Sequence, residues 1–251
     1  RPGLKAPAER PLSAGAVFCP AASPGDGPFL RYHEPMERGP YILDLDGTLM
    51  PTHDLDNRCY WLAVDDVFQT GPEPRDLHGF HRVTDDGILD EWSGRTLERQ
   101  LTTEERDAIK QRFLVRLEQA AEDEPEAFRP FPGVVDWLAS QAPGSLAIAT
   151  GGWRHTATFK LFVAGLDRFA LPLASSDEAP TRTGIMLTAQ RQLAPDRQLA
   201  TPTYLGDGAW DLAACRDLAW NFIGIARGNR ARALHRAGAE QVIEDFLPLL
   251  P

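Results

Sequence analysis

The chain has 251 residues, 43% of them hydrophobic and 25% charged, and a formal net charge of −10 at pH 7. This length allows one well-packed core and a smaller second domain; no apolar stretch approaches the roughly 18 residues of a membrane span, and the acidic balance disfavours non-specific nucleic-acid binding, which needs a basic surface. Three widely spaced cysteines, Cys19, Cys59 and Cys215, match neither a disulfide framework nor a zinc cluster and favour a reducing cytoplasm.

The N-terminal segment differs in composition from the rest of the chain. Residues 1–35 are rich in proline, glycine, alanine and serine, which predicts an irregular extension over residues 1–36. The segment lacks the compact apolar core of a secretory signal. Met36 directly precedes the first predicted strand, and we hypothesise that it is the natural start.

Two aspartates follow the first predicted strand. The apolar run 41–43 indicates a buried strand, and segment 44–49, Asp-Leu-Asp-Gly-Thr-Leu, comes directly after it. Because side chains two apart on a strand point the same way, Asp44 and Asp46 are predicted to face one site. Such a pair suits a hard cation such as Mg²⁺, or a nucleophile beside a general acid/base. The alternative is an Asp-Gly turn that carries surface acids.

The stretch from about residue 54 to 131 is predicted to be a helical insertion. Apolar residues at helical spacing indicate one helix around residues 60–68, and residues 70–100 are rich in turn signals such as Asp-Gly at 86–87 and Ser-Gly at 93–94. A capping box formed by Thr102 and Glu105 opens a second helix. Its apolar face carries Ile109, Phe113, Leu114 and Leu117.

Apolar runs alternate with helix-like segments in the rest of the chain. Strands are predicted at 41–45, 146–150, 170–174, 202–206, 221–226 and 240–243. Helices are predicted near 154–165, 181–192, 210–219 and 228–237. This alternation predicts an α/β fold with a parallel sheet covered on both faces. Ligands of such sheets bind beyond the carboxyl ends of the strands, where Asp44, Thr150 and Asp207 are all predicted to emerge.

Four segments carry polar or glycine-rich patterns in a fixed order. They are segment 44–49, segment 146–152 (Leu-Ala-Ile-Ala-Thr-Gly-Gly), segment 176–182 (Ser-Asp-Glu-Ala-Pro-Thr-Arg) and segment 204–211 (Tyr-Leu-Gly-Asp-Gly-Ala-Trp-Asp). These segments resemble, in order, the four motifs of the haloacid dehalogenase-like (HAD) hydrolase superfamily. Segment 130–134, Pro-Phe-Pro-Gly-Val, also resembles the re-entry point from the inserted cap domain of that family.

The resemblance implies a Rossmann-like, doubly wound parallel sheet with a helical cap inserted after the first motif, as in phosphoglycolate phosphatase-like members. It implies an α/β core over residues 37–53 and 132–251 and a cap over residues 54–131. Caps of this kind close over the strand ends and exclude water.

The resemblance also implies roles for the acids. Asp44 is expected to be the nucleophile that forms an aspartyl-phosphate. Asp46 is expected to be the general acid/base, which the phosphatases of the family carry and the dehalogenases lack. Mg²⁺ is the implied cofactor, held by Asp44, the backbone carbonyl of Asp46 and Asp207, with Asp211 bound directly or through water. For Asp207 and the glycine after it, a plain strand-to-helix turn is the alternative.

The second motif is expected to bind the phosphoryl oxygens. The Thr150 hydroxyl would donate a hydrogen bond, and the amides of Gly151 and Gly152 can approach closely because glycine lacks a side chain. The alternative is a threonine N-cap followed by a flexible turn.

The third motif departs from the family pattern because segment 176–182 contains no lysine. Arg182 is assigned the cationic role there, since its planar fork suits phosphate oxygens. A structural salt bridge from Arg182 to Asp177 is the alternative. Lys160, in the middle of a predicted helix, is predicted to be a surface residue.

Several other residues are weaker candidates. Five of them could contact the substrate or lie on the solvated surface: His53, Arg58, Arg82, Asp86 and Arg95. Trp153 and Trp210 could be packing residues or could line the pocket.

These patterns and the resemblance together predict a cytoplasmic, Mg²⁺-dependent phosphatase of small phosphomonoesters. Its partner would be a small phosphorylated metabolite, with neither nucleic acid nor membrane involved. A phosphomutase and a non-catalytic phospholigand-binding module are the alternatives. Specificity would reside in cap loops that carry no recognisable code.

Overall fold

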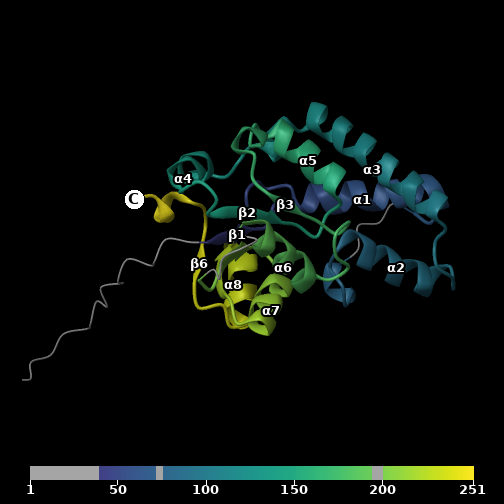
Figure 1. Ribbon diagram of the computed structural model, residues 1–251. Helices are drawn as coiled ribbons and strands as arrows, with labels where there is room; N and C mark the ends of the chain where they lie inside the picture. The colour runs from purple at the N-terminus through teal and green to yellow at the C-terminus, as the bar shows by residue number, and fades with distance from the viewer. Residues whose placement is uncertain (1–39, 72–75, 194–199) are drawn as a thin grey trace, which may run out of the picture. The chain divides into compact units, whose positions relative to one another are not determined.

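A parallel sheet of six strands lies within the computed structural model, which describes residues 40–71, 76–193 and 200–251. The strands are β1 (Tyr41–Leu43), β2 (Leu146–Ala149), β3 (Leu173–Ala174), β4 (Thr203–Gly206), β5 (Asn221–Ile225) and β6 (Val242–Ile243). They lie in the order β3–β2–β1–β4–β5–β6 (Figure 1). Each predicted strand is therefore confirmed. The predicted extension over residues 1–36, with Met36, lies outside the described residues.

Strand β1 lies between β2 and β4 and is buried on both faces. Tyr41 pairs in register with Leu146 on one side and with Thr203 on the other. Because side chains alternate along a strand, Leu43 joins one apolar cluster while Ile42 joins another on the opposite face. A strand covered on both faces reads as a continuous apolar run, as segment 41–43 does.

Helices cover both faces of the sheet (Figure 1). The cluster around Leu43 includes side chains from α4 (Val134–Ser140) and α5 (Arg154–Val163). The cluster around Ile42 includes side chains from α6 (Arg182–Leu193) and α7 (Ala209–Leu218). A 3₁₀ turn, Asp167–Phe169, follows α5, and α8 (Gly228–Arg236) and the 3₁₀ turn Leu247–Leu249 lie near the C-terminus. The predicted doubly wound α/β fold is confirmed.

The segment between β1 and α4 is mainly helical. It contains α1 (His53–Phe68), α2 (Asp85–Thr96) and α3 (Thr103–Asp123), with 3₁₀ turns at Leu77–Gly79 and Pro125–Phe128. Its apolar side chains form a cluster of their own, here termed the cap cluster, which also includes Trp153 just before α5 and Phe159 within it. The cap boundaries at residues 54 and 131 stay predictions.

Helix α2 corrects the prediction that residues 70–100 are rich in turns. The Asp-Gly and Ser-Gly pairs at 86–87 and 93–94 both lie inside this helix. Thr84 caps its first turn, because the Thr84 side chain accepts a hydrogen bond from the Gly87 amide at 3.1 Å. The cap cluster then buries Ile88, Leu89 and Trp92. Capping and burial together outweigh the low helix propensity of glycine, a cost of about 1 kcal/mol per residue.

Helix α3 begins as the sequence predicts. Thr102 Oγ1 accepts a hydrogen bond from the Glu105 amide at 3.2 Å, and Glu105 Oε2 accepts one from the Thr102 amide at 2.9 Å. The predicted apolar face is buried at Ile109, Phe113 and Leu117. Neither α3 nor any other helix in the described ranges combines the length and the apolar character needed to cross a membrane.

Candidate active site

The order of the strands reverses between β1 and β4. Strands β2 and β3 lie on one side of β1, and β4, β5 and β6 lie on the other. In open parallel sheets ligands bind at such a switch point, beyond the carboxyl ends of the strands. Asp44 directly follows β1, Asp207 directly follows β4, and the Asp44 amide donates to the Leu205 carbonyl at 2.9 Å. The sheet topology therefore brings the two aspartates together.

Three buried carboxylates converge at this point. Asp44, Asp207 and Asp211 each offer one oxygen, and the three oxygens lie within 4.8 Å of one another. Asp211 belongs to the first turn of α7. Asp207 Oδ1 is buried and has no hydrogen-bond partner among the described residues. Hard cations such as Mg²⁺ take oxygen ligands, so the three carboxylates and the unpartnered oxygen fit such an ion.

The side chain of Asp46 binds other groups. Thr52 Oγ1 donates to Asp46 Oδ1 at 2.6 Å, and Lys160 Nζ donates to Asp46 Oδ2 at 2.5 Å. The Asp46 carboxylate is not one of the three that converge. A metal-binding role for Asp46, assigned above to its backbone carbonyl, stays a prediction.

Arg182 places a positive charge beside the converging carboxylates. It is the first residue of α6, and its Nη1 donates to Asp44 Oδ1 at 3.3 Å while its Nε lies 3.0 Å from Asp211 Oδ1. The alternative partner, Asp177, pairs with Lys110 at 2.7 Å. A guanidinium stays charged when buried, so Arg182 can offset part of the local negative charge.

Burial and mutual repulsion disfavour the ionised forms of Asp44 and Asp211. Burial raises the pKa of Asp44 well above its usual range; Arg182 acts in the opposite direction, and repulsion from Asp211 and Asp207 adds to the rise. Burial also raises the pKa of Asp211 to about 6, against the lowering effect of Arg182. Because unlike charge favours the ionised form, a divalent cation between these groups would lower both pKa values.

A glycine at the turn after β1 lets the first and fourth motifs meet. Gly47 has φ +79°, and a Cβ at this position would lie 2.1 Å from Asp207 Oδ2. Glycine adopts this left-handed conformation without a steric cost. A side chain at Gly47 would therefore displace the Asp207 carboxylate.

His53 contacts the site from the start of α1. Its Nδ1 lies 3.0 Å from Asp207 Oδ2, and its ring stacks on Trp210 with the centroids 6.0 Å apart. Burial acts to lower the pKa of His53, but the interaction with Asp207 outweighs burial and the pKa is raised. His53 thus joins the helical insertion to the fourth motif.

The prediction that Lys160 is a surface residue is wrong. The residue is 0% exposed, and its Nζ donates to Asp46 Oδ2 at 2.5 Å and to Asp56 Oδ1 at 2.6 Å. Burial acts to lower the pKa of Lys160, yet the pKa is raised because attraction to the two carboxylates is stronger. Burial of an ammonium is costly unless it is paired in this way. The contact links Asp46 to α1 of the insertion.

The second motif forms a tight loop after β2. Thr150 is 1% exposed, and its Oγ1 accepts a hydrogen bond from the Gly152 amide at 3.1 Å. A Cβ at Gly151 would lie 2.9 Å from the Val83 carbonyl, so glycine allows the loop before α2 to approach. The phosphate-binding roles of Thr150, Gly151 and Gly152 stay predictions.

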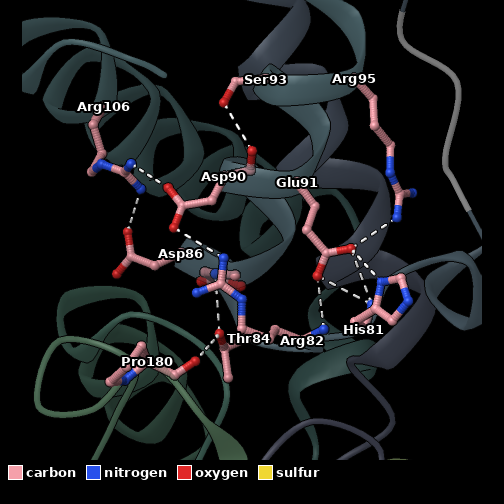
Figure 2. A network of polar contacts seen from close by, with 12 residues as sticks. His81, Arg82, Thr84, Asp86, Asp90, Glu91, Ser93, Arg95, Arg106 and Pro180 are labelled. Carbon is pink, nitrogen blue, oxygen red and sulfur yellow. Dashed lines mark hydrogen bonds and ion pairs between the residues drawn. The ribbon is translucent and has the colours of Figure 1, made fainter. Parts of the chain in front are cut away.

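The start of α2 is bonded directly to this loop. The Asp85 amide donates to the Gly151 carbonyl at 2.8 Å, and Asp85 Oδ2 accepts a hydrogen bond from the Trp153 amide at 2.8 Å. Thr84 Oγ1 donates to the Pro180 carbonyl at 3.3 Å (Figure 2). These contacts fix the Asp85 side chain beside the second motif.

Ion pairs and hydrogen bonds also hold α2 further along the helix (Figure 2). Arg106 of α3 donates to Asp86 at 2.6 Å and to Asp90 at 2.7 Å. Glu91 accepts hydrogen bonds from the backbone amides of His81 and Arg82. The orientation of α2, and with it the position of Asp85, is therefore set by polar contacts at its start and along its length.

A cavity of about 70 Å³ lies between these groups. Residues of the predicted core that line it are Asp44, Asp46, Thr150, Gly151, Gly152, Arg182, Asp207 and Trp210. The segment from α1 to α2 contributes His53, Asp56, Asn57, Tyr60, Leu77, Val83, Thr84, Asp85 and Ile88. Every predicted site residue except Asp211 lines this cavity.

The remaining weak candidates lie elsewhere. Ion pairs join Arg58 to Glu124, Arg82 to Asp90, Asp86 to Arg106 and Arg95 to Glu91. None of the four candidates lines the cavity. Trp153 is fully buried in the cap cluster, which makes it a packing residue, whereas Trp210 lines the cavity.

Sequence reasoning missed Asp56, Asp85 and the burial of Lys160. The sequence could have indicated the burial of Lys160, because positions 153, 156, 157 and 160 share one face of a helix and this face is buried. It could also have indicated that Asp85 begins a helix, since Thr84 is an N-cap residue followed by apolar residues at helical spacing. Nothing in the sequence marks Asp56, because one acid in the first turn of a helix is common.

No protein-family model matches the chain, and no curated protein matches its sequence. Solved structures do match. A hydrolase from Pseudomonas syringae is 23% identical with a TM-score of 0.63, over 84% of this chain and 96% of that one. A haloacid dehalogenase-like hydrolase from Streptococcus pneumoniae is 18% identical with a TM-score of 0.55, over 84% and 96%. A predicted phosphoglycolate phosphatase from Haemophilus somnus is 18% identical with a TM-score of 0.53, over 83% and 95%.

These likenesses cover 83–84% of this chain, and they agree with the motifs in the sequence. The chain therefore has the fold of the haloacid dehalogenase-like hydrolases.

Proposed function

We propose that this protein is a Mg²⁺-dependent phosphatase that hydrolyses small phosphomonoesters through an aspartyl-phosphate on Asp44. The observation that carries the proposal is the convergence of Asp44, Asp207 and Asp211 within 4.8 Å at the switch point of the sheet. The contact of Arg182 with Asp44 supports it, because a phosphoryl group needs a cation beside its nucleophile.

In the first step, an Asp44 oxygen attacks phosphorus and the bond from phosphorus to the alcohol oxygen breaks. Asp46 gives its proton to the leaving oxygen, so the alcohol departs neutral. Arg182 and the Thr150 hydroxyl stabilise the charge on the transferring group. Thr52 and Lys160, which both donate to Asp46, keep its carboxyl group oriented for this transfer.

In the second step, water attacks the phosphorus of the aspartyl-phosphate and Asp46 takes the proton from that water. The bond between Asp44 and phosphorus breaks, which releases inorganic phosphate and restores both carboxyl groups. Mg²⁺, held by Asp44, Asp207 and Asp211, would supply positive charge to the phosphoryl oxygens. Side chains of the helical insertion form part of the cavity wall and so reduce the access of bulk water to the reacting groups.

Phosphate release from a panel of small phosphomonoesters, with and without Mg²⁺, tests the proposal. Asp44→Asn should abolish release, and Asp46→Asn should slow it by about 10²–10⁴-fold, the usual contribution of a general acid/base. The matched control is Asp136→Asn, because Asp136 is an exposed aspartate of α4.

Release that survives Asp44→Asn, or that ignores Mg²⁺, would overturn the mechanism. A phosphorylated product isomer in place of inorganic phosphate would identify a phosphomutase. Mg²⁺-dependent binding of an ester without any product would identify a binding module.

A further inference from the structure

We propose that the leaving group of the substrate carries hydrogen-bond donors, as hydroxyl or ammonium groups, and carries no carboxylate or second phosphate. This inference rests on the proposed function and names the class of ester that the cavity takes. The observation behind it is the pair of carboxylates, Asp56 and Asp85, that the helical insertion places in the cavity wall.

Both carboxylates are fixed by the fold. Asp56 Oδ1 accepts a hydrogen bond from Lys160 at 2.6 Å, and Asp85 Oδ2 accepts one from the Trp153 amide at 2.8 Å. Asp85 is also held through its own amide, which donates to the Gly151 carbonyl. Neither side chain can therefore swing out of the wall to make room for an anion without breaking these bonds.

The basic residues of the cavity wall already contact the carboxylates that would surround the phosphoryl group. Among the described residues, Arg182 and His53 are the basic residues that line the cavity, against five aspartates. Arg182 contacts Asp44 and Asp211, and His53 contacts Asp207. Lys160 does not line the cavity and is 0% exposed. The Lys160 ammonium is instead taken up by Asp46 and Asp56. A carboxylate on the leaving group would thus meet Asp56 and Asp85, and no basic side chain of the described cavity wall other than Arg182 and His53 could pair with it.

The neighbours of the two wall carboxylates offset only part of the cost of their burial. Burial raises the pKa of Asp56 to about 6, with added repulsion from Asp46, although Lys160 acts to lower it. Burial raises the pKa of Asp85 well above its usual range, with added repulsion from Asp56, against the lowering effect of Lys160 and the Trp153 amide. A hydroxyl or ammonium group in the cavity would relieve this deficit of donors and positive charge, whereas a further anion would increase the repulsion.

The size and apolar lining of the cavity restrict the leaving group further. About 70 Å³ has room for only a few water molecules, at roughly 10–15 Å³ each. Leu77, Val83 and Ile88 supply apolar surface in the same wall, which suits a short methylene chain. The geometry therefore fits a small polyol or amino-alcohol phosphate.

Four two-carbon esters that differ only at the far end of the leaving group test this inference. They are 2-hydroxyethyl phosphate, phosphoethanolamine, ethyl phosphate and phosphoglycolate. We expect kcat/KM for the hydroxyl or the ammonium ester to exceed that for phosphoglycolate by at least about tenfold, equivalent to about 1.4 kcal/mol, with ethyl phosphate between them. An ammonium ester that is faster than the hydroxyl ester assigns the preference to charge, and equal rates assign it to hydrogen bonding.

Asp85→Asn should reduce the ratio of kcat/KM between phosphoethanolamine and phosphoglycolate, because it replaces the acidic group with a neutral amide of the same shape. Asp107→Asn is the matched control, since Asp107 is an exposed residue of α3 that does not line the cavity, and it should leave the ratio unchanged. Hydrolysis of phosphoglycolate at least as fast as that of both donor-bearing esters would overturn the inference while leaving the phosphatase proposal intact.

If none of the four esters releases phosphate, binding decides the substrate class. Calorimetry with the wild-type protein and Mg²⁺ should then show tighter binding of phosphoethanolamine or 2-hydroxyethyl phosphate than of phosphoglycolate. Equal or reversed affinities, or no binding of the donor-bearing esters, would overturn the inference.

Discussion

At the scale of single residues, Lys160 joins three segments that are far apart in the chain. It belongs to α5, and it donates to Asp46 after β1 and to Asp56 in α1. A buried charge pair contributes little beyond what its desolvation costs, but removal of one partner leaves the other charge uncompensated. Lys160 therefore stabilises the arrangement chiefly by preventing that penalty at Asp46 and Asp56.

Lys160→Met should lower the free energy of unfolding by about 3–5 kcal/mol, the usual effect of removing one partner of a buried pair. Urea unfolding at pH 7 measures the change. Lys110→Met is the matched control, because Lys110 is partly exposed and pairs with Asp177 at the surface; its cost should be about 0–1 kcal/mol. Equal costs for the two variants would contradict the burial of Lys160.

Gly47→Ala should abolish Mg²⁺-dependent phosphate release, because the new Cβ would lie 2.1 Å from Asp207 Oδ2. The backbone strain at positive φ adds about 1–2 kcal/mol. Gly144→Ala separates the two effects, since Gly144 has φ +76° and a Cβ there would meet no atom within 4 Å. We expect Gly144→Ala to lose similar stability and to keep activity. Wild-type release by Gly47→Ala would show that Asp207 tolerates displacement.

The residues that sequence reasoning placed correctly share a simple origin. Asp44, Thr150 and Asp207 directly follow strands, so their convergence depends only on strand order in a parallel sheet. Lys160 and Asp85 meet the site through the packing of helices, and a pattern read along one segment does not contain the partner on another. The sequence therefore predicted which residues follow a strand. It did not predict which side chains on different helices form pairs.

At the scale of elements, α3 shows how a local motif fixes a helix start. Glu105 belongs to the capping box with Thr102 and also accepts hydrogen bonds from Arg99 at 2.6 and 2.7 Å. The hydrogen bonds from Arg99 and from the Thr102 amide lower the pKa of Glu105 to about 2. Ionised Glu105 is therefore favoured in the folded protein.

Glu105→Gln should destabilise the protein at pH 7, and the difference from wild type should shrink as the pH falls. A carboxyl whose pKa drops from 4.5 to about 2 on folding contributes stability that is present above its ordinary pKa and lost as the pH falls through its folded value. Thermal unfolding between pH 7 and pH 2 measures this. Glu118→Gln, an exposed change in the same helix, should show no such trend; the same trend in both would contradict the assignment.

The elements themselves differed in how far their sequences determine them. The strand and helix positions after residue 145 followed from apolar runs in alternation, most clearly at β2 and β4, which are buried along their whole length. Helix α2 did not, since its glycines are local turn signals and its stability comes from the Thr84 cap and the cap cluster. Tertiary packing overrode local propensity there.

At the scale of the whole molecule, the site is built from segments across the chain. Asp44 and Asp46 follow β1, Arg182 opens α6, and Asp207 and Asp211 surround the start of α7. Lys160 and Asp85 then connect the helical insertion to the same place. A ligand that binds only the assembled site stabilises the folded state by mass action, so an ion held there should raise the stability of the whole described fold.

Mg²⁺ should therefore raise the free energy of unfolding, by about 2.7 kcal/mol at a concentration one hundred times its Kd, and a chelator should reverse the gain. Asp211→Asn should lose most of this Mg²⁺-dependent increment, because Asp211 supplies one of the three converging oxygens. Asp217→Asn, an exposed change in the same helix, should retain it. The increment, and not the absolute stability, is the diagnostic quantity, since Asp211→Asn also relieves repulsion within the cluster. An equal increment in both variants would place the ion elsewhere.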